Sequence, residues 1–305
     1  MMAIAGKRSE SERNDQSGNS NDEADASNTP EELSQDLLYD LLHPKEPARA
    51  VLVWVAAGLT GLALVAFLIG TTSVPELMLI VLVYIVLILG AIWLAKQLAY
   101  ALFRGNAVRV GPAQFPDIHD RIVEAEKRLG LTQGVASFVV RNGDLNAFFY
   151  RVSGRKFLII HSTMVEDMTP EELDFIILRF LGYLRARQVD LGWIAQTVDV
   201  LNAVPILGLL TRSYDRAAVL SGDRIGAYAC ESTETARSAL AKFAVGAKLE
   251  PQFSSTAYLN QAQEFRQSPW NFLSRLWRTH PHLTDRIIEL DVWINEYTAK
   301  LAEFS

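Results

Sequence analysis

The side chains of this chain that could do chemistry are few and scattered. His280 and His282 lie two residues apart, which on a strand would place both imidazoles on one side, but Pro281 between them favours a loop. Ser162 directly follows His161, and neighbouring residues on a strand point to opposite faces, so the two do not form a nucleophile and its base. His280 is therefore interpreted as structural, and no serine hydrolase or new metal site is predicted.

The composition points to a membrane protein and argues against nucleic acid as a partner. The 305 residues carry a net charge of -6, whereas phosphate binding needs a basic face. Hydrophobic residues make up 50% of the chain, and the excess is concentrated in two runs. The single cysteine, Cys230, excludes an internal disulfide and fits a reducing compartment.

Two uncharged runs predict a pair of transmembrane helices. Residues 50–70 and 77–94 contain no charged residue, and each run spans roughly 30 Å as a helix. Residues 71–76 have no Lys or Arg, and the basic residues lie outside the runs: Lys45, Arg49, Lys96 and Arg104. The positive-inside rule therefore predicts that both termini and the main domain are cytoplasmic. The alternative is a buried helical hairpin of a soluble protein, which rarely lacks polar residues on every face.

The regions around these runs give four predicted segments. They are a disordered acidic tail (1–29), a juxtamembrane amphipathic helix (30–48), the transmembrane hairpin (49–104) and a cytoplasmic domain (105–305). Thr29 and Pro30 are typical of a helix start, and Pro44 and Pro47 are expected to end that helix before the membrane. The helix could lie on the membrane or pack on the main domain.

The main domain is predicted to be α+β and mostly helical, with a small β-sheet. Strands are expected over residues 134–140 and 156–161, with a turn at Asn142-Gly143 between them. Helices are expected over residues 116–129, from residue 170 onward, and over residues 215–232, 234–249 and 285–304. Ser221-Gly222 is interpreted as a break in the third of these helices.

Residues 191–210 are apolar but interrupted. The interrupting residues are Gln196, Asp199, Asn202 and Pro205. A third membrane span is one interpretation, but a charged residue in mid-span is costly, so an element that rests on the bilayer or is buried is favoured.

Several separate pieces of the sequence match one order of motifs. They are Asn146-Ala147-Phe148, residues 168–173, Leu181-Gly182 with Arg187, residues 216–226, and Thr279-His280-Pro281 with Asp285-Arg286-Ile287. In this order, and behind two spans, they resemble the HtpX-like family of membrane zinc metallopeptidases, gluzincins related to the CAAX prenyl proteases. The resemblance covers residues 108–290. It implies a zincin-like metallopeptidase domain behind two transmembrane helices, in a bacterial inner membrane.

The positions at which this family binds and uses zinc hold other residues here. The resemblance places the two His ligands at Arg179 and Tyr183, the general base at Phe180 and a Glu ligand at Val219. A guanidinium has no lone pair for a metal, and a phenyl ring cannot take a proton from water. Because all four positions differ while the frame is kept, no catalytic residue, no metal ligand and no cofactor are predicted.

One consequence is a charge pair in place of the metal. In the family, the residue that matches Asp223 accepts a hydrogen bond from a zinc-binding His, so Asp223 is expected to face Arg179. The alternative is that Arg179 points to solvent and Asp223 caps a turn.

The segment Asn146-Ala147-Phe148-Phe149 is the main feature that could still bind a ligand. The resemblance makes it an edge element beside the substrate cleft, and an edge strand pairs with an extended peptide through backbone hydrogen bonds that need no zinc. Phe148, Phe149 and Tyr150 could add apolar contacts or pack in the core.

Three functional hypotheses remain open. The first is a catalytically inactive, membrane-anchored pseudoprotease that binds a peptide or a membrane-protein partner, with membrane-protein quality control as the role that the family implies. The second is an active zinc metalloendopeptidase with atypical ligands. The third is a structural membrane subunit, in which Arg179, Phe180 and Tyr183 fill the cleft. An open cleft favours the first and a filled cleft the third.

Overall fold

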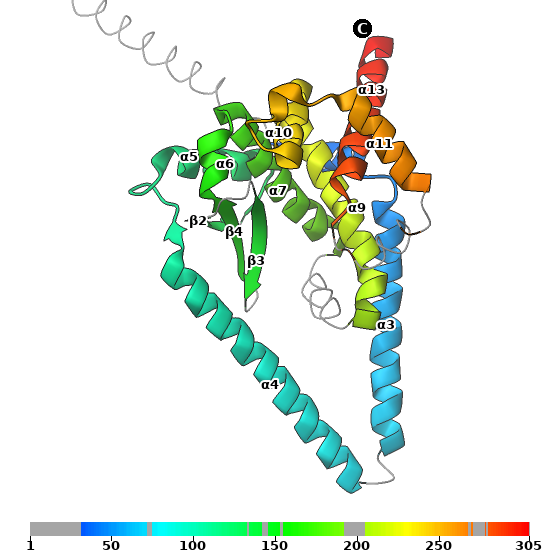
Figure 1. The fold of residues 1–305 in the computed structure, drawn as a ribbon. Coiled ribbons are helices and arrows are strands. Elements are labelled where there is room, and N and C mark those ends of the chain that lie inside the picture. The colour runs from blue at the N-terminus through cyan, green and yellow to red at the C-terminus, as the bar shows by residue number, and fades with distance from the viewer. Residues whose placement is uncertain are drawn as a thin grey trace, which may run out of the picture.

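A computed structural model describes most of the chain after the N-terminal tail. The described residues are 32–71, 75–132, 134–141, 146–152, 155–191, 205–267, 270, 278 and 280–304. The predictions for residues 1–29, for the Asn142-Gly143 turn and for the interrupted residues 192–204 lie outside them. In the described residues the fold is mostly helical, with one four-stranded sheet, so the predicted α+β class is confirmed (Figure 1).

Two long apolar helices extend away from the domain in a V (Figure 1). Helices α3 (Glu46–Thr71) and α4 (Pro75–Asn106) are long and apolar enough to cross a membrane. No side chain of the stretch Met78–Asn106 is buried, which weighs against the buried hairpin. Pro47 does not precede α3 as predicted but lies in its first turn, where a missing N–H costs nothing.

Each arm of the V is attached to the domain at its open end. The start of α3 packs Ala50 and Val53 against Tyr214 of the domain. The buried carboxylate of Glu46 accepts a hydrogen bond from the Ser221 hydroxyl. At the end of α4, aromatic side chains pack on the sheet: Tyr100 stacks on Phe157, and Phe103 meets Phe138 edge to face. The two arms therefore begin at opposite sides of the domain.

Helix α2 (Gln35–Leu41) begins later than the sequence suggested. Residues 32–34 are not helical, and the hydroxyl of Ser34 caps the helix by accepting from the Leu37 N–H at 3.3 Å. The helix predicted from Pro30 therefore does not run through residues 32–34, because the serine cap starts α2 at Gln35; Thr29 and Pro30 lie outside the described residues. Leu38 and Leu41 are buried in the main core, so α2 packs on the domain.

The sheet has the strand order β1-β2-β4-β3. Its strands are β1 (Val108–Arg109), β2 (Ala136–Val140), β3 (Ala147–Val152) and β4 (Arg155–His161). The two strands predicted on either side of Asn142-Gly143 are β2 and β4, which pair in parallel, so their connection is a crossover and not a two-stranded hairpin. Strand β3 intervenes in the sequence and pairs with β4 in antiparallel fashion, at the edge of the sheet.

Helices cover one side of the sheet and continue beyond it. They are α5 (Pro116–Arg128), α6 (Ser162–Asp167), α7 (Pro170–Leu191), α9 (Pro205–Ala229), α10 (Thr233–Val245), the 3-10 turn η2 (Glu250–Gln252), α11 (Ser255–Gln267) and α13 (Leu283–Phe304). Helix α7 begins at the predicted place with a capping box, because Thr169 and Glu172 each accept the other's backbone N–H.

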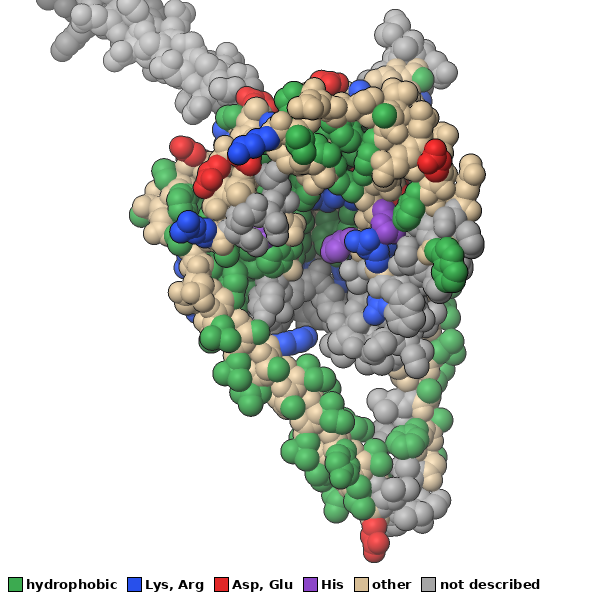
Figure 2. Space-filling model, in the orientation of Figure 1, with side chains coloured by type: hydrophobic (Ala, Val, Ile, Leu, Met, Phe, Trp, Pro, Cys, Tyr) green, Lys and Arg blue, Asp and Glu red, His purple; other side chains and the backbone are tan. Residues whose placement is uncertain are grey.

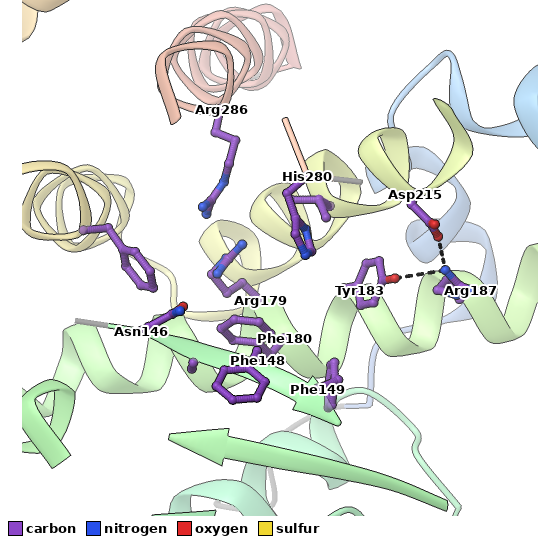
Figure 3. A pocket seen from close by; sticks show the side chains of 13 residues that line it. Asn146, Phe148, Phe149, Arg179, Phe180, Tyr183, Arg187, Asp215, His280 and Arg286 are labelled. Carbon is purple, nitrogen blue, oxygen red and sulfur yellow. Dashed lines mark hydrogen bonds and ion pairs between the residues drawn. The ribbon is translucent and has the colours of Figure 1, made fainter. Parts of the chain in front are cut away.

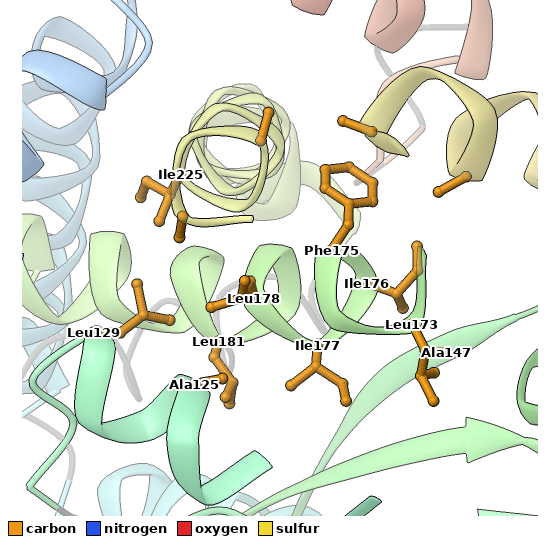
Figure 4. Close-up of a cluster of buried hydrophobic side chains, with 14 of the residues drawn as sticks. Ala125, Leu129, Ala147, Leu173, Phe175, Ile176, Ile177, Leu178, Leu181 and Ile225 are labelled. Atoms are coloured by element: carbon orange, nitrogen blue, oxygen red, sulfur yellow. The ribbon is translucent and has the colours of Figure 1, made fainter. Parts of the chain in front are cut away.

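Helix α7 is the centre of the main hydrophobic core (Figure 4). Its apolar side chains point both toward α5 and the sheet and toward α9; fully buried examples are Phe175, Ile176, Ile177 and Leu181. A helix that is apolar on most of its faces must be covered on all of those faces, so the rest of the domain encloses α7.

Helices α7 and α9 cross at very short range. A Cβ added at Gly222 would lie 2.7 Å from the carbonyl oxygen of Arg179, and one at Gly226 would lie 2.8–2.9 Å from the Cβ, Cα and N of Arg179. These glycines let two backbones meet. Ser221-Gly222 is thus not the predicted break, and α9 continues through it, because its glycine serves packing between helices and not a turn.

We expect Gly226→Ala to destabilise the domain although alanine favours helix. The methyl group must displace the backbone of α7, at a cost of about 1–3 kcal/mol, against a propensity gain of about 0.5–1 kcal/mol. The midpoint of thermal unfolding in detergent should fall. Gly111→Ala is the matched control, because nothing lies within 4 Å of the added Cβ. Equal midpoints for both variants would contradict the close crossing.

Candidate functional site

A cavity of about 520 Å³ lies between the start of β3 and helices α7 and α9 (Figure 3). Figure 2 shows the corresponding hollow in the face of the domain, with histidine and basic side chains beside it. Its lining comprises Asn146, Ala147, Phe148 and Phe149 from β3 and the residue before it, Arg179, Phe180, Tyr183 and Arg187 from α7, Asp215 and Val219 from α9, and Phe243, His280 and Arg286. All the predicted site residues except Asp223 line this one cavity.

Two stripes of side chains face one another across the helix crossing. On α7, Arg179, Tyr183 and Arg187 are spaced by four residues and therefore share a face. On α9 the corresponding stripe is Asp215, Val219 and Asp223. Arg179 pairs with Asp223 and Arg187 pairs with Asp215, so the stripes run in opposite directions and place an ion pair at each end.

The first ion pair is part of a buried triad. The Arg179 Nε donates to Asp223 Oδ1 at 2.7 Å, which is the contact expected from the sequence. Arg286 of α13 also binds this carboxylate, with its Nε 2.8 Å from Oδ2 and its Nη2 2.9 Å from Oδ1. All three residues are at most 8% exposed, so one carboxylate joins α7, α9 and α13 in the interior.

The charges of the triad shift one another's titration. Burial alone would raise the pKa of Asp223, but the two guanidinium groups outweigh it and hold this pKa below its usual range. Burial, and then the charge of Arg286, lowers the pKa of Arg179 to about 10, so Arg179 stays charged at neutral pH. The triad therefore has two positive charges and one negative charge.

Aromatic rings support the guanidinium groups. The Arg179 guanidinium lies 4.5 Å from the centre of the Phe180 ring, and Arg179 and Arg286 both lie 5.9 Å from the centre of Phe243. Such contacts stabilise a cation within about 6 Å of a ring face. Phe149 packs against Phe180 edge to face and stacks on Tyr183, so it is partly a core residue.

The second ion pair closes the other end of the cavity. Arg187 forms a buried ion pair with Asp215 and donates to the Tyr183 hydroxyl at 3.0 Å (Figure 3). Tyr183 is therefore held over the cavity floor by its phenol as well as by its ring. This pair is balanced in charge, whereas the triad is not.

His280 enters the cavity from the segment before α13 (Figure 3). The residue as a whole is exposed. Partial burial of its imidazole lowers the pKa of the ring, and the charges of Arg179 and Arg286 lower that pKa further. Its ring is neutral at pH 7 and can both donate and accept a hydrogen bond.

Two comparisons with known proteins match parts of the chain. Residues 178–294, from α7 to α13, match Peptidase family M48. The curated protein named plastoglobule-localized metallopeptidase 48, chloroplastic, of Arabidopsis thaliana is 27% identical over 210 residues, which cover 62% of this chain and 60% of that protein. No solved structure matches. Residues 178–294 are thus similar to Peptidase family M48, and two apolar helices that could span a membrane precede them.

The residues of the cavity do not fit the zinc ion that the resemblance to zinc metallopeptidases implies. Arginine offers a metal no lone pair, and Asp223 already accepts hydrogen bonds from two guanidinium groups. Two buried positive charges also repel a cation. In the part of the chain that the structure describes, no three His, Cys, Asp or Glu side chains are close enough to hold a metal.

The sequence did not place four of these residues in the site: Arg187, Asp215, Phe243 and Arg286. Arg286 belonged to the Arg-Ile pattern but was given no role, and its place on α13 brings it to Asp223 from 63 positions away. Asp215 could have been found from the sequence, because it lies four residues before Val219 and therefore shares its helix face. Phe243 carries no local signal.

We expect Asp223→Asn to destabilise the protein by about 3–5 kcal/mol, because two buried guanidinium groups lose their counter-charge. Chemical denaturation in detergent measures the effect. The control is Asp174→Asn, which breaks the more exposed Arg121–Asp174 pair and should cost about 1 kcal/mol or less. Similar losses in the two variants would mean that the triad does not stabilise the fold.

The contribution of Asp223 should depend on pH in one direction. Its pKa is lower in the folded state than the value of about 3.9 for an unfolded chain. Its stabilisation is therefore complete above that value and is lost as the pH falls through the folded pKa. The difference in unfolding free energy between the native chain and Asp223→Asn should be constant near neutral pH and shrink below about pH 4. A difference that grows on acidification would contradict the assignment.

Proposed function

We propose that this protein is a degenerate, HtpX-like member of Peptidase family M48 that binds an extended peptide without cutting it. One observation carries the proposal: an open cavity lies beside a sheet edge, while the positions matched to the zinc ligands and the general base hold Arg179, Tyr183, Val219 and Phe180. In this reading the protein is a pseudoprotease with neither a catalytic residue nor a bound metal.

The edge strand supplies the binding surface. Among the strands that the structure describes, β3 pairs with β4 alone, and its first residues line the cavity. An extended peptide would add to the free edge through backbone hydrogen bonds. Phe148 is 37% exposed, and its ring could contact a side chain of that peptide.

We propose that the two apolar helices cross the bilayer, which brings the domain close to segments of other membrane proteins. Lys45, Arg49, Lys96 and Arg104 flank them on the domain side, which favours a cytoplasmic domain. The partner in this proposal is a segment of a membrane protein, and membrane-protein quality control is the role that the family resemblance implies. No nucleic-acid partner is proposed.

A second function, an active zinc peptidase with atypical ligands, is favoured by one finding: the Arabidopsis relative is named a metallopeptidase. The structural-subunit alternative needed a filled cleft. A cavity of about 520 Å³ lies within the range of about 300–1,000 Å³ typical of ligand sites, which favours binding.

Elemental analysis of the full chain, purified in detergent without a chelator, separates these functions. We expect no stoichiometric zinc and no peptidase activity, because the cavity offers guanidinium groups where a cation would lie. About one zinc per chain, lost together with peptidase activity on chelation, would overturn the proposal in favour of the active enzyme.

Peptide binding is tested separately by calorimetry. The probe is an N-acetylated heptapeptide of alternating Val and Thr, and its control is the same peptide N-methylated at every residue, which has no backbone N–H left to donate from either edge. We expect the first to bind and the second to bind at least about tenfold more weakly, the loss of about one net hydrogen bond. Equal affinities would remove strand addition as the mode of binding.

A further inference from the structure

The cavity has an excess of positive charge at one end. Arg187 and Asp215 balance one another, but Arg179 and Arg286 share the single carboxylate of Asp223. Burying a charge without a counter-ion is costly, so an excess cation in the interior is usually compensated by a ligand or by solvent.

The two guanidinium groups also keep donors for a ligand. Among the described residues, Arg179 is bonded to Asp223 through Nε alone, and Arg286 through Nε and Nη2. Both terminal nitrogens of Arg179 and Nη1 of Arg286 are thus left for the cavity. Both residues are more than nine-tenths buried, and Figure 3 shows their guanidinium groups pointing toward one another beside His280.

The rest of the lining fixes what such a ligand would look like. Phe148, Phe180 and Phe243 offer aromatic surface, and the Asn146 side chain offers an amide. The cavity is far larger than a lone inorganic anion requires. Its shape therefore suits an anionic group attached to a body that is partly apolar and lies along β3.

We infer that Arg179 and Arg286 form a carboxylate-binding subsite, and that the preferred peptide presents a carboxylate at this end of the cavity. Planar guanidinium groups bind carboxylates through paired hydrogen bonds, and an aromatic floor suits both the cation and the peptide chain. The inference rests on the proposed peptide binding and specifies its ligand: with an arginine at the position matched to a metal ligand, the cavity favours a negative charge where a metallopeptidase would hold a cation.

The experiment compares three versions of the Val-Thr heptapeptide on the full chain in detergent, by calorimetry. One ends in a free carboxylate, one ends in an amide, and one ends in an amide but has an internal Glu. We expect one or both carboxylate peptides to bind about 10- to 150-fold more tightly than the uncharged amide, the range for hydrogen bonds to a charged group. The two carboxylate peptides distinguish a chain terminus from a side chain as the source.

Variants of Arg286 identify the subsite. Arg286→Gln should bring the ratio of carboxylate to amide affinity close to one, while Arg286→Lys, which keeps the charge, should retain part of the preference. The matched control is Arg121→Gln, which removes an arginine from a pair with Asp174, outside the cavity lining. The unfolding midpoint of each variant is measured in parallel, to show that the variant is folded. The comparison of the three peptides on the native chain needs no variant.

Each outcome has one meaning. If all three peptides bind equally and N-methylation weakens them, strand addition holds and the carboxylate subsite is wrong. If none binds, the proposed peptide binding itself fails. If carboxylate is preferred but Arg286→Gln and Arg121→Gln weaken it equally, the preference arises from the overall charge and the subsite is wrong.

Discussion

The close crossing of α7 and α9 is the constraint on which the site depends. Because Gly222 and Gly226 lack side chains, the two backbones meet at Arg179, and the stripes of polar residues on the two helices come within bonding distance. Larger residues at the glycines would separate the helices and break both ion pairs. The crossing also helps to position β3 across the cavity, since α9 and β3 pack into the same hydrophobic core as α7.

The buried triad joins three helices at one carboxylate, a role that metal ions commonly have in small domains. A carboxylate between two guanidinium groups provides directional bonds, but its formation requires the removal of three charges from water. The net gain is smaller than the individual bonds suggest, whereas the loss of one partner is expensive. Such a cluster favours one arrangement of α7, α9 and α13 and leaves a positive charge next to an accessible cavity.

The surroundings of the cavity combine a rigid scaffold with the edge of the described sheet. Aromatic contacts from Phe149 to Phe180 and Tyr183 tie β3 to α7, so the strand edge has a fixed position relative to the arginines. The arms α3 and α4 attach on opposite sides of the domain, through Glu46 and through the rings of Tyr100 and Phe103. The domain thus spans the open end of the V that the two apolar helices form (Figure 1).

The sequence by itself determined the features that depend on local periodicity and on residue chemistry. Uncharged runs indicated the two long helices, and the Thr169–Glu172 box marked the start of α7. Only the tertiary structure decided the parallel pairing of β2 with β4, the burial of α2 and the arrival of Arg286 at Asp223. These are contacts between distant segments, and neither helical nor strand periodicity carries information about which distant partner a face will meet. The charge excess in the cavity arose in the same way, because the second guanidinium comes from a helix whose own pattern gives no sign of the carboxylate that it binds.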